Sequence, residues 1–149
     1  MYVCVRFFGN AFESGDVDIV KLVAKKARAV IGNEGSFRTH VLNKVVYDAV
    51  RNLVRGKKGA EEIWAYLKEH DPLNYTSALH MANYASDLDT MKYIVEHILA
   101  WNDRDDTIFV IESLRRFRNS RLSDTHWDAQ SDKNHKFIAW METTVKELE

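Results

Sequence analysis

Four arginines surround one aromatic side chain in the sequence Leu114-Arg115-Arg116-Phe117-Arg118-Asn119-Ser120-Arg121. Guanidinium groups form paired hydrogen bonds to phosphate oxygens, so this cluster could contact the backbone of a nucleic acid. The candidates are Arg115, Arg116, Arg118 and Arg121. The same residues lie near the end of a predicted helix, where arginines also bind the last carbonyl groups and oppose the helix dipole. Both interpretations stay open.

A second basic cluster brackets the end of another predicted helix and consists of Arg51, Arg55, Lys57 and Lys58. It allows the same two interpretations. If either cluster binds RNA, each phosphate contact contributes about one unit to the slope of log affinity against log salt concentration.

The charge is distributed unevenly along the chain. Residues 1–58 carry eleven Lys and Arg against five Asp and Glu, whereas residues 59–149 carry ten against seventeen. The net charge of the chain is −1. This split fits an anionic partner for the first half, two halves that attract each other, or solvated helix faces that happen to differ.

Motifs for catalysis and for cofactor binding are missing from the sequence. Gly32-Asn33-Glu34-Gly35-Ser36 has too few glycines for a phosphate-binding loop, and it follows a predicted helix rather than a strand. There is neither an HExxH motif nor a pair of cysteines. We therefore expect a protein that is not an enzyme and has no cofactor.

The best metal candidate combines Asp124-Thr125-His126-Trp127-Asp128 with His135, because alternating ligands in a loop can converge on a cation. A solvated polar loop explains the same residues, and we expect no metal.

Four tryptophans are many for 149 residues. Trp64 and Trp140 lie on apolar helical stripes, which predicts core packing. Trp101 and Trp127 flank polar loops and are candidates for anchors at a protein interface.

Composition predicts one all-α domain over residues 1–149. Hydrophobic residues make up 46% and charged residues 29%, and one Pro and six Gly interrupt the chain. Residues 2–8 could form a strand, or an extended or helical arm, ended by Gly9-Asn10. Residues 119–135 read as a polar loop. Apolar positions at helical spacing predict about seven helices, arranged as an antiparallel bundle or a short α-solenoid.

One predicted helix follows Asp16 and ends at Gly32-Asn33. Its predicted inner face is Ile19, Val20, Val23, Ala27, Val30 and Ile31. The strongest pattern is the next helix, which Ser36 caps and which ends at Gly56. Its apolar residues are Val41, Leu42, Val45, Val46, Ala49, Val50, Leu53 and Val54.

Helix pairs over about 39–70 and 74–102 form a faint repeat. The second reads Asn74-Tyr75-Thr76-Ser77-Ala78-Leu79, Tyr84-Ala85-Ser86-Asp87-Leu88-Asp89-Thr90-Met91 and Ile94-Val95-Glu96-His97-Ile98-Leu99. Residues 39–106 resemble pentatricopeptide repeats, although the turn glycine of that family is replaced around Asp87. The resemblance implies an α-solenoid whose concave face holds single-stranded RNA or a partner protein. It also implies a base-facing role for Ser77.

A single cysteine, Cys4, indicates a reducing compartment. No apolar run reaches the length needed to cross a bilayer, and the first residues do not resemble a secretory signal. We expect a cytoplasmic protein with no membrane association, or one of an organellar matrix if a targeting peptide was removed.

Three functions stay open. The first is a non-enzymatic helical module that binds RNA or assembles a ribonucleoprotein. The second is a protein–protein scaffold or adaptor without nucleic-acid contact; a small helical subunit of a CRISPR-type effector complex would have this size and composition. The third is an enzyme whose site assembles only in three dimensions. The sequence does not indicate an oligomeric state.

Overall fold

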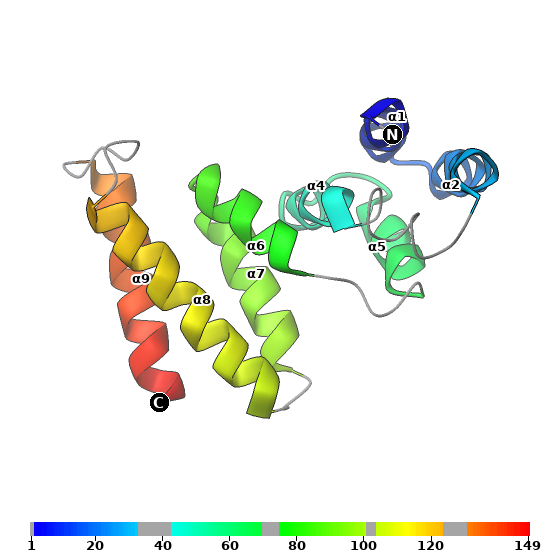
Figure 1. The fold of residues 1–149 in the computed structure, drawn as a ribbon. Coiled ribbons are helices and arrows are strands. Elements are labelled where there is room, and N and C mark those ends of the chain that lie inside the picture. Colours follow the sequence, from blue (N-terminus) through cyan, green and yellow to red (C-terminus); the bar gives the residue numbers. More distant parts are fainter. Residues whose placement is uncertain (1, 33–42, 70–74, 101–103, 124–130) are drawn as a thin grey trace. The chain divides into compact units, whose positions relative to one another are not determined.

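The computed structural model describes residues 2–32, 43–69, 75–100, 104–123 and 131–149, and all regular structure in these ranges is helical (Figure 1). The all-α prediction is confirmed. The described part of the chain contains eight helices, against about seven predicted. They are α1 (Tyr2–Ser14), α2 (Val17–Ile31), α4 (Asn43–Val54), α5 (Ala60–Lys68), α6 (Tyr75–Tyr84), α7 (Leu88–Leu99), α8 (Arg104–Ser123) and α9 (Asp132–Leu148).

The chain forms two compact units, Met1–Ala82 and Asn83–Glu149. We refer to them as unit 1 and unit 2 and describe each by itself. The prediction that residues 1–149 form a single helical domain stays a prediction.

The N-terminal segment is a helix, so the helical alternative is confirmed and the extended arm is wrong. Phe8, Ala11 and Phe12 follow helical spacing and are buried. The rings of Phe8 and Phe12 meet edge to face with their centroids 5.8 Å apart. Gly9 does not end the segment but lies inside α1. Burial of the two aromatic rings outweighs the modest helix-weakening effect of one glycine.

Helix α2 forms where the sequence predicts it, and of its predicted inner face Val20 and Ala27 are buried while other residues are not. Asp16 caps its start, since its Oδ1 accepts a hydrogen bond from the backbone N–H of Asp18 at 2.9 Å. Its buried residues are Val20, Ala24 and Ala27. Two residues of the predicted inner face, Ile19 and Val30, are exposed instead.

The core of unit 1 joins four helices. Helix α1 packs on α2 and α4, and α5 packs on α2 and α4. The core side chains of α4 and α5 are Val45, Val46, Ala49, Val50, Ile63, Trp64 and Leu67. The Trp64 ring also meets the Tyr75 ring edge to face, with centroids 6.5 Å apart. The prediction that Trp64 lies in the core is confirmed.

Two turns of unit 1 meet through glycines. Gly15 separates α1 from α2, Gly59 precedes α5, and both have positive φ angles, 69° and 78°. A Cβ atom on Gly15 would collide with the carbonyl oxygen of Lys58, and one on Gly59 would collide with that of Gly15. Only residues without a side chain allow the two backbones to come this close.

Unit 2 contains α7, α8 and α9, with α7 packed on α8 and α8 on α9. Helices α8 and α9 run antiparallel (Figure 1). Their buried apolar side chains are Val110, Leu114, Phe117, Phe137, Met141 and Val145. Trp140 is half-buried, and its ring lies edge to face against that of Phe137. The polar loop predicted over 119–135 is wrong at both ends, because α8 continues to Ser123 and α9 begins at Asp132.

Candidate functional site

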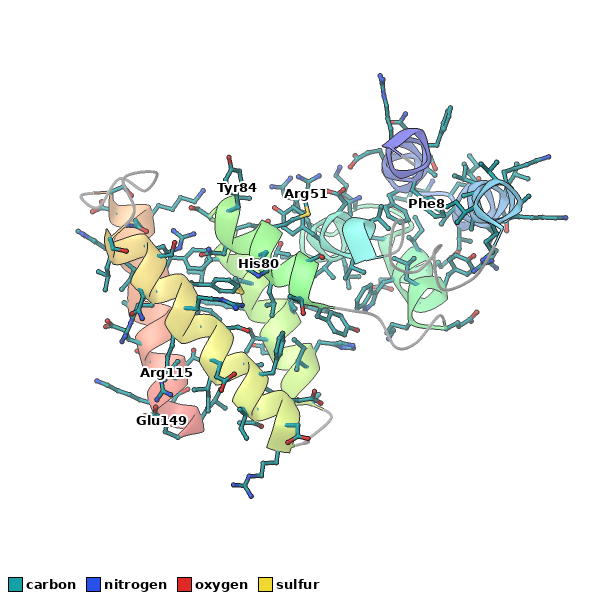
Figure 2. The ribbon with its side chains drawn as sticks, in the orientation of Figure 1. Phe8, Arg51, His80, Tyr84, Arg115 and Glu149 are labelled. Atoms are coloured by element: carbon teal, nitrogen blue, oxygen red, sulfur yellow. The ribbon has the colours of Figure 1, made fainter. Side chains whose placement is uncertain are left out.

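Three arginines of α8 lie at its surface, and each contacts a neighbouring group of unit 2. Arg115 forms an ion pair with Glu149 at the end of α9, and Figure 2 shows the two side chains together. Arg118 donates from Nη2 to Oδ1 of Asn119 at 2.9 Å. Arg116 is exposed, with its guanidinium carbon 5.6 Å from the centroid of the Phe117 ring.

Arg121 does not belong with these three, and its assignment as a phosphate contact is wrong. Its side chain is 1% exposed. It donates to Asn83, Ser86 and Asn134, and its guanidinium carbon lies 4.0 Å from the centroid of the Phe137 ring. Burial lowers the pKa of Arg121 to about 10. The guanidinium is therefore charged at neutral pH but out of reach of a phosphate.

The basic cluster around the end of α4 is also partly neutralised. Arg51 Nη2 lies 3.3 Å from Asp48 Oδ1 and 3.9 Å from Glu13 Oε1. Lys57 Nζ lies 2.5 Å from Glu13 Oε2. Arg55 and Lys58 are exposed. The carboxylate of Glu13, contributed by α1, thus reaches two of the four predicted phosphate contacts.

The two carboxylates of this cluster have pKa values displaced in opposite directions. The hydrogen bond from Lys57 lowers the pKa of Glu13, with smaller contributions from Asn52 and Arg51. Burial raises the pKa of Asp48, against the attraction of Arg51. The pKa shifts mean that Glu13 binds a proton less readily, and Asp48 more readily, than an ordinary carboxylate of its type.

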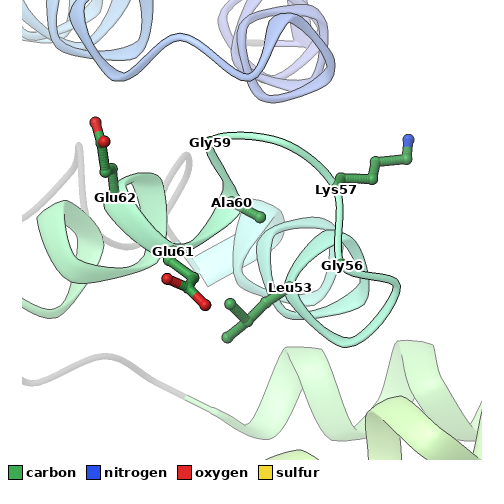
Figure 3. Close-up of a pocket in the computed structure, with 7 residues that line it drawn as sticks. All are labelled: Leu53, Gly56, Lys57, Gly59, Ala60, Glu61 and Glu62. Atoms are coloured by element: carbon green, nitrogen blue, oxygen red, sulfur yellow. The ribbon is translucent and has the colours of Figure 1, made fainter.

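A shallow pocket of about 190 Å³ lies beside the turn between α4 and α5 (Figure 3). Its lining residues are Leu53, Gly56, Lys57, Gly59, Ala60, Glu61 and Glu62. Pockets for small molecules usually measure roughly 300–1,000 Å³, so this one is small. The carboxylates of Glu61 and Glu62 also oppose an anion at the start of α5. The pocket is a poor phosphate site.

Helix α2 presents large apolar side chains to solvent. Ile19, Leu22 and Val30 are 42%, 56% and 79% exposed. At 100° per residue these three positions fall within an arc of about 80°. The exposed Lys26 lies inside this arc, and the exposed Lys25 lies beside it. We call the five residues Ile19, Leu22, Lys25, Lys26 and Val30 the α2 face.

Sequence reasoning missed the α2 face because it assigned Ile19 and Val30 to the core. A signal was present, since Leu22 lies off the predicted inner stripe. Residues 17–31 contain more large apolar side chains than one buried face can hold.

The remaining predicted site residues contribute less. Ser77 is half-buried on α6. Trp101, Trp127 and the metal candidate 124–128 lie outside the described residues. Within the described ranges, no group of three His, Cys, Asp or Glu side chains is placed to hold a metal ion. None of the helices described here combines the length and apolar character needed to cross a membrane.

No protein-family model matches this chain, and neither a curated protein nor a solved structure matches it. The resemblance of residues 39–106 to pentatricopeptide repeats therefore stays a hypothesis.

Proposed function

We propose that this chain is a helical protein-interaction module and that the α2 face is its docking surface. The observation that carries the proposal is the exposure of Ile19, Leu22 and Val30 on one side of a helix whose opposite side is already buried. Burying a large aliphatic side chain contributes about 1.5–3 kcal/mol. A partner that covers the three side chains would therefore gain a binding free energy several times RT. Large apolar side chains exposed together on one helix face are typical of binding sites.

The basic clusters support RNA binding less well. Arg51, Lys57 and Arg115 hold carboxylates of the chain itself, which a phosphate would have to displace. Arg55, Lys58 and Arg116 are more accessible. An RNA-binding module would also leave the apolar side chains of the α2 face without a role.

The pairing of neighbouring helices also supports a scaffold. Helix α1 pairs with α2, α4 with α5, and α8 with α9. Helical hairpins are also the building units of the α-solenoid that the pentatricopeptide resemblance implies.

Site-specific photo-crosslinking in the cells of origin tests this function. A photoreactive phenylalanine analogue placed at Leu22 should yield a discrete protein adduct. Leu122 of α8 is a matched control, because it is also a leucine on a helix and is 61% exposed. The same analogue at Leu122 should not give this adduct. Absence of a protein adduct at position 22 would contradict the proposal.

Binding of labelled single-stranded RNA to the purified chain tests the competing function. We expect no binding that depends on Arg55, Lys58 and Arg116. If affinity instead falls steeply with salt, and falls again when these three are replaced by Gln, the chain is an RNA-binding protein.

A further inference from the structure

The α2 face combines an apolar stripe with exposed lysines, and from this we infer that its occupant is an acidic amphipathic helix of a partner protein. The inference rests on the proposed function and specifies the partner.

The apolar side chains have the spacing of a ridge on a helix. Leu22 and Val30 lie three and eleven residues after Ile19, so the stripe runs roughly 16 Å along α2. Ridges of this kind pack into the grooves of a second helix. A partner helix of about three turns, with apolar residues on one side, would cover all three side chains.

The charge of the face is positive. Lys25 and Lys26 are exposed, and so is Lys21 farther around the helix, where its Nζ lies 5.8 Å from the centroid of the Tyr66 ring. Asp18, the one acidic residue of α2, falls between Lys25 and Leu22 around the helix, but it lies in the first turn, where its carboxylate complements the helix dipole. With Lys25 and Lys26 together the face keeps a net positive charge. A partner with carboxylates beside its apolar stripe would pair with Lys25 and Lys26.

The position of Lys26 on the α2 face favours a protein helix over a lipid surface as its occupant. Helices that lie in a membrane interface carry their lysines on the polar side and keep the apolar face free of charge. Here the Lys26 position falls between those of Leu22 and Ile19 around the helix. A carboxylate of a partner helix can reach this ammonium group while the flanking apolar side chains stay in contact. The phosphates of an RNA would pair with the lysines, but they would not bury the apolar side chains.

A display library of helical peptides with varied apolar patterns and varied charges tests the inference. The library is selected on the full chain and counter-selected on the double variant Leu22→Asp/Val30→Asp. We expect the enriched peptides to carry apolar residues at i, i+3 or i+4, and i+7, with an excess of Asp and Glu beside them. Their affinity should fall as salt rises.

Charge reversal provides the sharper test. In Lys25→Glu/Lys26→Glu, affinity for an enriched acidic peptide should fall about tenfold or more. The same peptide with its acids changed to Lys should bind this variant and not the native chain. Lys68→Glu/Lys146→Glu is the matched control, since both lysines are exposed and lie outside α2. The control should bind the acidic peptide like the native chain.

Three results would overturn the inference: no enriched peptide, enriched peptides without an acidic excess, or binding that survives charge reversal at positions 25 and 26. Anionic vesicles that bind the native chain but not the Leu22→Asp/Val30→Asp variant would replace the helix with a lipid surface. The two proposals fail separately. A protein adduct at position 22 together with non-acidic peptides keeps the docking surface and rejects only the acidic helix.

Discussion

Arg121 of α8 donates from Nε to Oδ1 of Asn83, 2.8 Å away and 38 residues earlier in the chain. The same guanidinium donates to Ser86 Oγ at 3.1 Å and to Asn134 Oδ1 at 2.9 Å. One buried side chain thus joins the end of α6, the turn before α7, and the start of α9. Its hydrogen bonds offset much of the cost of burying a cation.

Replacing Arg121 by Met should destabilise unit 2 by about 3 kcal/mol, because it leaves buried oxygens of Asn83 and Asn134 without their donor. Urea denaturation followed by circular dichroism measures the loss. Arg116→Met removes the same charge from the surface of the same helix and should cost less than about 0.5 kcal/mol. Equal losses for the two variants would contradict the structural role of Arg121.

Ser86 has a φ angle of 52°, which is unfavourable for a residue with a side chain. Both Ser86→Ala and Ser86→Gly remove the hydrogen bond to Arg121, but only glycine relieves the backbone. Ser86→Gly should therefore be more stable than Ser86→Ala by about 1 kcal/mol in thermal or urea denaturation. At Ser120, inside α8, the order of the same two variants should reverse, because glycine weakens a helix. The same order at both positions would refute this account.

Gly59→Ala should destabilise unit 1 far more than Gly56→Ala, although the two glycines flank one short turn. Both have positive φ angles, so alanine costs about 1–2 kcal/mol at either position. At Gly59 the new methyl group also collides with the Gly15 carbonyl, whereas nothing lies within 4 Å of it at Gly56. Melting temperatures of the two variants test the difference, and similar values would exclude the close contact of the two turns.

Glu13 should make the stability of unit 1 depend on pH. Because the pKa of Glu13 is lowered in the folded chain, its stabilising contribution is complete above the ordinary carboxyl range and is lost as pH falls through the lowered value. Its side chain is 48% exposed, so we expect less than about 1 kcal/mol at neutral pH. The free energy of unfolding of Glu13→Gln should approach that of the wild type in acid and also at high salt.

Asp48→Asn is the matched comparison, because burial raises the pKa of Asp48 and the sign reverses. Folding increases the proton affinity of Asp48, so the wild type should gain stability relative to Asp48→Asn as pH falls through the raised value. As pH falls through the acid range, the free energy of unfolding of Glu13→Gln should therefore rise relative to that of the wild type. The free energy of unfolding of Asp48→Asn should fall relative to that of the wild type. Parallel behaviour would show that the directions assigned to the two pKa values are wrong.

Sequence periodicity predicted the helices well where the apolar residues form one stripe. Helix α4 is the clearest case, since Val45, Val46, Ala49 and Val50 are all buried, although Val54 at its end is exposed. At α2, where apolar residues surround much of the helix, sequence periodicity predicted the helix but only part of its buried face. Which side of such a helix meets the core depends on its neighbours, here α1 and α5, and not on its own pattern.

The candidate sites were harder to predict for a similar reason. The local sequence around Arg121 is basic and polar, which is typical of a surface, and its partners Asn83 and Asn134 are distant in sequence. The neutralisation of Lys57 by Glu13 likewise joins residues 44 positions apart. The spacing of residues within one helix does not predict hydrogen bonds or ion pairs between residues that are distant in sequence. The exposed apolar stripe of α2 was in principle visible as an excess of large side chains.

The meeting of Gly15 and Gly59 also constrains how this chain can diverge. A mutation at either position is disfavoured while the other turn keeps its place, and no substitution at the partner position compensates, because the colliding atoms belong to the backbone. Descendants that retain this arrangement should therefore keep both glycines while the lysines between Gly56 and Gly59 vary. Two invariant glycines 44 residues apart would mark true relatives of unit 1 even after the rest of the sequence has drifted beyond recognition.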